Sequence, residues 1–257
     1  MDPGRMSARP GFAHEEALMI EYAEATHTFT SPKGNPVQMH YRKNSSDWNT
    51  LWSALNEDEY KLAGRSFTGY ALDVGAHIGS VSLGLAIDNP GLTVISVEPV
   101  PDNVEFLRRN ASVNGLSLVI LEAAGAGPDD ERTTINYRYR GTEAAEHHAF
   151  IGDASLIEGT GQPTLEHETR DIACVSIGAI LDWNGIDRLS VVKIDCEGCE
   201  FRMLTDPAID RVDLIVGEWH PNGNKTQGMF RALLEATHDV TFSGFEAGPG
   251  GFVAVRR

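Results

Sequence analysis

An acidic residue lies at or just beyond the end of four separate apolar runs of the chain. The runs read YALDV, LTVISV, LSVVKI and VDLIV, and the acidic residues are Asp73, Glu98, Asp195 and Glu218. Short runs rich in valine, isoleucine and leucine are typical of buried strands. In an open parallel sheet, ligands bind beyond the carboxyl ends of the strands. We therefore expect the four carboxylates to share one ligand site, although strand termination alone would explain one or two of them.

A glycine turn follows the first of these runs and precedes a helical pattern. Gly75 and Gly79 bracket the turn in GYALDVGAHIGSVSLG, where the backbone must approach a neighbour closely or take a positive φ. A strand, a glycine turn and a helix N-terminus together suit the polar part of a nucleotide-like ligand. The alternative interpretation is that the glycines only permit tight packing.

The residues of the turn indicate which ligand this is. In the dinucleotide fingerprint G-x-G-x-x-G, His77 and Ser80 would stand at the second and third glycine positions. Close approach of a pyrophosphate is therefore disfavoured, and with it an NAD-linked dehydrogenase. Glu98 still offers a carboxylate suited to two ribose hydroxyls. S-adenosylmethionine, which has a ribose, a cationic sulfonium and no phosphate, fits this acidic turn.

The composition excludes several classes of partner. A formal net charge of -16 argues against nucleic acid, whose binding depends on lysine and arginine. No apolar run approaches the roughly 18 residues of a membrane span, so we expect no membrane partner, and the first residues lack the apolar core of a signal peptide. An odd count of 3 cysteines does not indicate a disulfide framework. We therefore expect a reducing compartment and a cytoplasmic protein.

The elements that must position these residues alternate between strand and helix patterns, which predicts a doubly wound, mostly parallel α/β sheet. Strands are expected over 37–42, 70–74, 92–97, 118–121, 133–139, 172–177, 189–194, 212–216, 240–245 and 252–255. Helices are expected over 14–26, 48–55, 101–114, 180–183, from 199, and over 226–237. Residues 1–65 are expected to form a helical cover with a flexible start, and residues 66–257 the sheet domain. The polar stretch 140–170 is expected to be a functional lid, since loops of this length are rare in compact domains.

Several segments carry a resemblance to a known family. They read SSDWNTLW and EDEY before the sheet, and then LDVGAHIGSVSL, VISVEPVPDNVEFLRRNASVNG, GDASL, SIGAILD and VVKIDCEGCEFRML. In these the chain resembles the FkbM-type O-methyltransferases, which are class I S-adenosylmethionine-dependent enzymes. The resemblance implies a seven-stranded Rossmann-like sheet. It also implies a cofactor site formed by Asp73, Gly75, His77, Gly79, Ser80, Glu98, Pro99, Asn103, Ala123 and Asp195.

The acceptor half of the site is less determined. A hydroxyl is a weak nucleophile that needs a base, a metal ion or both. Asp195, Glu218 and His220 could hold Mg²⁺ through oxygen ligands, with His220 as a third ligand or the base. His147 and His148 in the expected lid are alternative bases. The two carboxylates could instead bind substrate hydroxyls or cap helices.

Two further patterns have ordinary explanations. Cys196 and Cys199 form a C-x-x-C, but they belong to the EGxE box of the resemblance, and a redox or zinc role is not expected. Trp48 and Trp52, four residues apart, are expected to pack rather than to form a platform for a sugar.

The sequence thus predicts an S-adenosylmethionine-dependent O-methyltransferase that acts on a hydroxyl of a small molecule, with a saccharide favoured. Among saccharides, the resemblance points to a partly methylated mannoside at its anomeric hydroxyl. The alternatives are a polyketide or other secondary-metabolite hydroxyl, or a non-catalytic relative that only binds S-adenosylmethionine.

Overall fold

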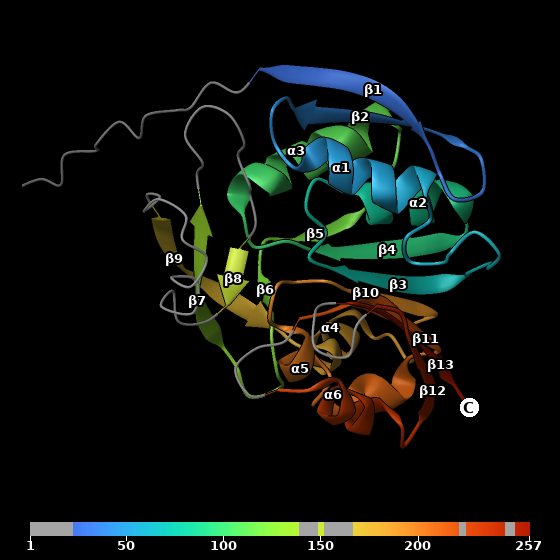
Figure 1. The fold of residues 1–257 in the computed structure, drawn as a ribbon, viewed down its shortest axis with the longest axis vertical. Coiled ribbons are helices and arrows are strands. Elements are labelled where there is room, and N and C mark those ends of the chain that lie inside the picture. The colour runs from blue at the N-terminus through green and yellow to red at the C-terminus, as the bar shows by residue number, and fades with distance from the viewer. Residues whose placement is uncertain (1–22, 139–148, 152–166, 221–224, 245–249) are drawn as a thin grey trace, which may run out of the picture.

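The computed structural model describes residues 23–138, 149–151, 167–220, 225–244 and 250–257. A sheet of seven strands, in the order β12-β13-β11-β10-β3-β4-β5, organises them (Figure 1). β5, β4, β3, β10 and β11 run parallel to one another. β13 is antiparallel to β11, and β12 is antiparallel to β13. The strands are β3 Gly69–Val74, β4 Leu92–Val97, β5 Val119–Leu121, β10 Val191–Ile194, β11 Leu214–Trp219, β12 His238–Phe242 and β13 Gly250–Arg256.

Helices cover both faces of this sheet, which confirms the doubly wound α/β fold (Figure 1). One face carries α1 (Asp47–Leu51), α2 (Ser80–Asp88) and α3 (Pro101–Val113), and the other α4 (Ile177–Asn184), α5 (Glu200–Met203) and α6 (Gln227–Leu234). The helix boundaries follow local chemistry. The Ser176 hydroxyl accepts the N–H of Ala179 and so ends the preceding strand two residues earlier than expected. A 3-10 helix, Pro207–Arg211, links α5 to β11.

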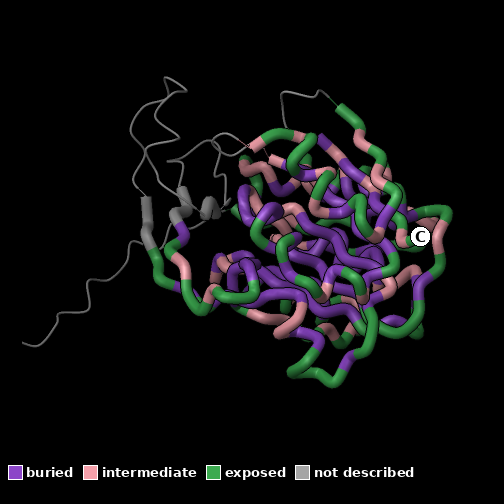
Figure 2. The backbone as a smooth tube through the Cα atoms, turned by 90° about the horizontal axis from the view of Figure 1, so that it is seen from below, coloured by how far each residue is buried: buried purple, intermediate pink, exposed green. Residues whose placement is uncertain are grey.

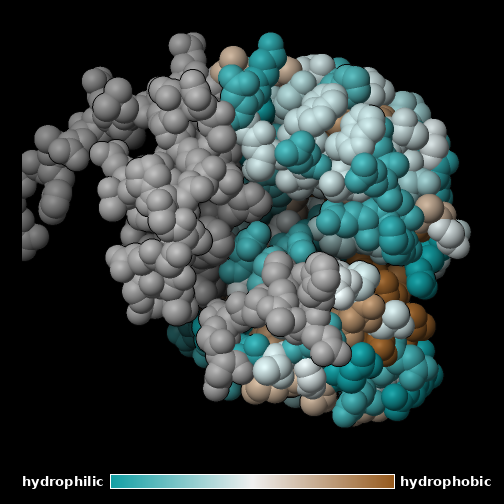
Figure 3. Space-filling model, viewed as in Figure 1, coloured by the Kyte–Doolittle hydropathy of each residue, from teal (hydrophilic) through white to brown (hydrophobic). Residues whose placement is uncertain are grey.

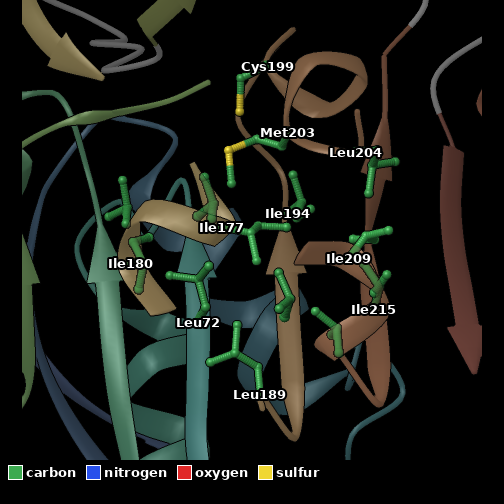
Figure 4. Close-up of a cluster of buried hydrophobic side chains, with 14 of the residues drawn as sticks. Leu72, Ile177, Ile180, Leu189, Ile194, Cys199, Met203, Leu204, Ile209 and Ile215 are labelled. Atoms are coloured by element: carbon green, nitrogen blue, oxygen red, sulfur yellow. The ribbon is translucent and has the colours of Figure 1, made fainter. Parts of the chain in front are cut away.

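The core consists of separate apolar layers on the two faces of the sheet. In β10, Val191 belongs to the layer under α2, whereas Val192 and Ile194 belong to the layer under α4 to α6, because successive strand side chains point to opposite faces. Figure 4 shows the second layer, and Figure 2 shows the buried chain running through the centre of the molecule. Burying one such side chain contributes roughly 1.5–3 kcal/mol, so these layers fix where the strands end and the site begins.

A second sheet of four strands has the order β6-β9-β7-β8. Its strands are β6 Ala124–Gly125, β7 Arg132–Arg138, β8 Ala149–Ile151 and β9 His167–Val175. The expected lid, 140–170, overlaps this sheet, since residues 149–151 and 167–170 pair as strands. The remainder of the expected lid lies outside the described residues.

The cover before the sheet contains a hairpin of strands as well as helices. The strand expected over 37–42 is found, but the helix expected over 14–26 is wrong for residues 24–26. Residues 24–26 begin the strand β1 (Glu24–Thr30), which pairs antiparallel with β2 (Pro36–Arg42). Phe29 and Val37 are partners in this hairpin and are both buried, and their burial overrides the helix propensity of the alanines and glutamates nearby. Helix α1 leads into a π-helix, η1 (Trp52–Asn56). Residues 14–22 of the expected first helix lie outside the described residues.

The hairpin and α1 are anchored on α2 and α3. Phe29, Met39 and Leu51 share an apolar cluster with Leu83 and Leu107. The described face in Figure 3 is largely hydrophilic, as expected for a chain with a net charge of -16. Within the described part of the chain, no helix is both long and apolar enough to cross a bilayer.

Candidate active site

A cavity of about 280 Å³ lies at the carboxyl ends of β3, β4, β10 and β11. Glu98, Asp195 and Glu218 line it, so three of the four strand-end carboxylates share one space. Asp73 is fully buried beneath them and is not among the cavity-lining residues that the structure describes. The wall opposite the sheet comes from the N-terminal cover, through Asn49 and Ser53 and neighbouring residues.

The glycine turn forms the floor of the cavity. Gly75 has a φ of 75°, and a Cβ added there would lie 1.8 Å from the carbonyl oxygen of Asp195. No side chain fits, because both the backbone conformation and the close approach exclude one. Gly79 has a φ of 103° and packs against Leu107 and Leu83, so its part is to seat helix α2. Both readings of the glycines therefore apply, one to each residue.

A buried lysine ties the turn to the sheet. The ammonium of Lys193 donates to the carbonyl of Gly75 at 2.8 Å and lies 3.3 Å from a carboxylate oxygen of Asp73. Asp73 also accepts from the Ser82 hydroxyl of α2 at 2.6 Å. Burial alone would lower the pKa of Lys193, but the carboxylates of Asp73 and Asp195 outweigh it and hold the pKa above its usual value. Asp73 thus supports the turn through Lys193 and α2.

Glu98 is held in place by three protein donors. The N–H of Val100 and the side-chain amide of Asn103 donate to one carboxylate oxygen, each at 3.0 Å, and the N–H of His77 donates to the other at 2.8 Å. Burial raises the pKa of Glu98 in spite of these hydrogen bonds. Pro99 lines the cavity beside it. This fixed, desolvated carboxylate suits the recognition of paired hydroxyls.

Of the other predicted cofactor residues, some line the cavity and one is buried beside it. His77 and Ser80 line the cavity. Ala123 is buried, and its neighbours Ala124 and Gly125 form the lining in its place.

Carboxylates gather at the opposite end of the cavity. Glu59, Asp195, Glu197 and Glu218 line this end. The hydroxyl of Tyr60 donates to Asp195 at 2.7 Å across 135 residues of chain. Burial, and then the charge of Asp195, raise the pKa values of both Glu59 and Glu218. A carboxylate with a raised pKa is a better proton acceptor for a hydroxyl.

His220 lies behind this group and is already engaged. Its Nδ1 is 2.9 Å from Glu200, and its Nε2 is 3.5 Å from Glu197 and 3.8 Å from Glu218. Burial opposes the charged ring, but the hydrogen bond and charge of Glu200, with further carboxylates, raise the pKa of His220 to about 9. At neutral pH the ring is therefore an imidazolium, which orients carboxylates and has no free site to accept a proton.

We expect this imidazolium to stabilise the fold in a pH-dependent way. Because the folded pKa is raised, the stabilisation is fully present below about pH 6.5 and is lost as the pH rises through about 9. In EDTA, urea unfolding should show wild-type stability falling over this range, with His220→Gln less stable at pH 6 by up to about 3 kcal/mol. His40→Gln, on β2, is the control and should follow the wild-type profile. A His220→Gln profile with the same slope as wild type would contradict this assignment.

The EGxE box has a structural explanation. The buried carboxylate of Glu200 accepts the N–H groups of Cys196 and Gly198. This closes a tight loop in which Cys196 and Cys199 form a disulfide, with Cα atoms 5.5 Å apart. The cysteine count did not indicate a disulfide framework, and this pair departs from that expectation because the loop brings the two residues within bonding reach.

The remaining predicted residues lie outside the cavity or outside the described chain. His147 and His148 are outside the described residues. Trp48 packs against Phe29 and Tyr41, as expected, and Trp52 stacks on Trp48 with 39% of its surface exposed.

Several cavity residues were not predicted. Lys193 had a signal, since a lysine within the buried run VVKI calls for a buried partner. Glu59 and Tyr60 belong to the segment EDEY of the family resemblance, which assigned neither a role, and only tertiary contacts bring them to the strand ends.

A doubly wound sheet ending in an antiparallel pair, with a cavity at its carboxyl edge, is the fold of the class I methyltransferases. Residues 73–243 match the methyltransferase FkbM domain, and the chain belongs to the FkbM methyltransferase family.

Individual relatives are distant. Methyltransferase sdnD of Sordaria araneosa is 24% identical over 217 residues, which cover 75% of this chain and 82% of that protein. The precorrin-6y C5,15-methyltransferase from Geobacter metallireducens GS-15 has a TM-score of 0.41 at 14% identity, covering 74% of this chain and 82% of its own. An rRNA methylase from Streptococcus thermophilus has a TM-score of 0.43 at 7% identity, covering 79% and 95%.

Proposed function

We propose that this methyltransferase transfers the methyl group of S-adenosylmethionine to a hydroxyl of a small molecule, most simply a saccharide. The observation that carries the proposal is a single cavity with two chemically distinct ends. One end has the glycine turn and the fixed carboxylate of Glu98, and the other has Glu59, Asp195 and Glu218. A nucleoside would occupy the first end and a hydroxyl-bearing acceptor the second.

The cofactor end supplies position rather than covalent chemistry. S-adenosylmethionine, when bound, supplies an electrophilic methyl on a sulfonium. Glu98 binds the ribose hydroxyls, and the turn at Gly75 and His77 lets the amino-acid part approach the backbone. Asp195, which follows β10 beside Gly75, places negative charge near the sulfonium. Holding both partners in line removes much of the entropic barrier to the displacement.

The acceptor end binds and activates the hydroxyl. Glu218 is the base we favour, because its pKa is raised by burial and by Asp195, and Asp195 already accepts from Tyr60. Neighbouring carboxylates can accept hydrogen bonds from further hydroxyls, which favours a polyhydroxylated acceptor over an anionic one. A partly methylated mannoside, methylated at its anomeric hydroxyl, is one acceptor of this kind.

A divalent cation at this end is a separate part of the proposal. Asp195, Glu218 and His220 each offer a ligand atom, and these atoms lie within 4.8 Å of one another. The two carboxylates fit Mg²⁺, whereas His220 could serve as a ligand only after its imidazolium lost a proton, and its Nδ1 is engaged by Glu200. A bound cation would lower the pKa of the acceptor hydroxyl.

Calorimetry with S-adenosylhomocysteine, followed by methyl-transfer assays on a glycoside panel with and without EDTA, tests this function. We expect binding of the demethylated cofactor and transfer to at least one polyhydroxylated acceptor. Absence of cofactor binding would sink the proposal. Binding without transfer to glycosides or polyketide alcohols would instead favour a non-catalytic relative, and loss of transfer in EDTA would establish the cation.

A further inference from the structure

A buried ion pair in the N-terminal cover lies next to the cofactor end of the cavity. Arg42, at the end of β2, and Asp47, at the start of α1, are exposed by only 1% and 0%. The guanidinium donates to both carboxylate oxygens, at 2.9 and 2.8 Å. A buried ion pair costs desolvation and is weak evidence for a purely stabilising role, so its other contacts are informative.

Two chains of contacts lead from this pair to Glu98. Arg42 donates to the side-chain oxygen of Asn103 at 2.7 Å, and the Asn103 amide nitrogen donates to one oxygen of Glu98 at 3.0 Å. On the other side, Asp47 lies 3.3 Å from Nε2 of His77, whose backbone N–H donates to the second oxygen of Glu98 at 2.8 Å. The ion pair therefore supports both oxygens of one carboxylate.

The chemistry of the first chain fixes an orientation. A guanidinium has donors only, and a carboxylate has acceptors only. Between them the amide of Asn103 has a single satisfactory orientation, with its oxygen toward Arg42 and its nitrogen toward Glu98. Without Arg42 the amide could turn its oxygen toward the carboxylate, and Glu98 would lose a donor.

The second chain fixes a backbone conformation. His77 has a φ of 51°, in the left-handed region that non-glycine residues rarely adopt. Its ring meets Asp47, and this contact holds the strained residue with its N–H directed at Glu98. A histidine in this turn, which excludes a dinucleotide fingerprint, thus has a specific partner in the cover.

We propose that Arg42 and Asp47 are positioning residues for ribose recognition, which aim the Glu98 carboxylate through Asn103 and His77. The inference rests on the proposed function, since it assigns Glu98 to the ribose. Both residues lie outside the matched family domain, residues 73–243. The N-terminal cover is therefore part of the cofactor site and not only a lid over the sheet.

The test is ribose discrimination in the full-length protein. Adenosine and 2′,3′-dideoxyadenosine compete with S-adenosylhomocysteine in displacement calorimetry. The dissociation constant of dideoxyadenosine divided by that of adenosine reports the contact of Glu98 with the ribose hydroxyls. The variants are Arg42→Lys, which keeps the charge but loses the paired donors of the guanidinium, and Asp47→Asn. A general loss of stability would weaken both nucleosides equally and leave this ratio unchanged.

Arg109→Lys is the matched control. Arg109 and Arg42 stack on the same Phe106 ring, at 5.1 and 5.0 Å, and Arg109 also joins the cover to α3 through an exposed ion pair with Glu24. We expect the ratio to fall about tenfold in Arg42→Lys, as for loss of one hydrogen bond to a charged group, and to stay unchanged in Arg109→Lys.

Asn103→Ala keeps the test decisive if Arg42→Lys or Asp47→Asn does not fold. It leaves the ion pair intact, removes the link to Glu98, and should lower the ratio to a similar extent. The inference alone would be overturned if the ratio stayed unchanged in the folded variants. It would also be overturned if the wild-type protein bound S-adenosylhomocysteine but did not distinguish the two nucleosides. A wild-type protein that binds no S-adenosylhomocysteine would overturn the proposed function.

Discussion

Replacing Gly75 with alanine is expected to abolish binding of S-adenosylhomocysteine and to destabilise the fold by about 3 kcal/mol or more. The added Cβ would lie 1.8 Å from the carbonyl oxygen of Asp195, so the ends of β3 and β10 must separate. The positive φ of 75° adds roughly 1 kcal/mol of backbone strain. Urea unfolding and calorimetry measure the two effects.

Gly115→Ala separates strain from collision in this experiment. Gly115 has a similar φ of 67°, but nothing lies within 4 Å of an added Cβ. We expect it to cost about 1 kcal/mol and to leave cofactor binding intact. If Gly75→Ala matched Gly115→Ala in both measurements, the close approach of Gly75 to Asp195 would contribute nothing to stability or to cofactor binding.

Replacing Glu218 with glutamine is expected to lower the rate of methyl transfer by about 10²- to 10⁴-fold, the usual contribution of a general base. The substitution keeps size and hydrogen bonding but removes the proton acceptor. Binding of S-adenosylhomocysteine should change little, because Glu218 lies at the acceptor end of the cavity, away from Glu98.

The pH profile makes this prediction specific. Because burial and Asp195 raise the pKa of Glu218, the wild-type rate should rise with pH through a value above the usual 4.5, and Glu218→Gln should lack this limb. Glu57→Gln is the control, since Glu57 bonds Trp52 on the outer side of η1 and should keep wild-type rates. A Glu218→Gln enzyme with the wild-type rate and profile would remove Glu218 from the mechanism.

Much of the sheet domain was predictable because its signals are local. Buried strands of a parallel sheet are continuous apolar runs, and helix ends carry caps, so the strands 92–97 and 189–194 and the helix after Pro101 were expected nearly as found. In the hairpin of the cover the second strand was expected over 37–42, but the first strand was not. Phe29 and Val37 pair across a turn, and their burial, which no window of sequence shows, overrides helix propensity in the first strand.

The candidate site divides in the same way. Glu98 and the glycine turn could be recognised because strand ends and turn residues are local features that the parallel topology brings to one edge. Tyr60 meets Asp195 across 135 residues, and Arg42 reaches Asn103 across 61, and no spacing rule anticipates such contacts. His220 was expected as a third metal ligand or the base, but its proximity to Glu200, which follows from the loop of the EGxE box, makes it a cation at neutral pH.

The sequence by itself determined the class of fold, the position of the cofactor turn and the acidic character of the cavity. These depend on apolar periodicity, on glycine and on net charge, which are properties of the chain before it folds. Only the tertiary structure decided that the N-terminal cover reaches Glu98 and that Glu59 joins Asp195 and Glu218 in the cavity. The physical reason is that hydrogen bonds and raised pKa values depend on distances and burial, which packing of remote segments sets.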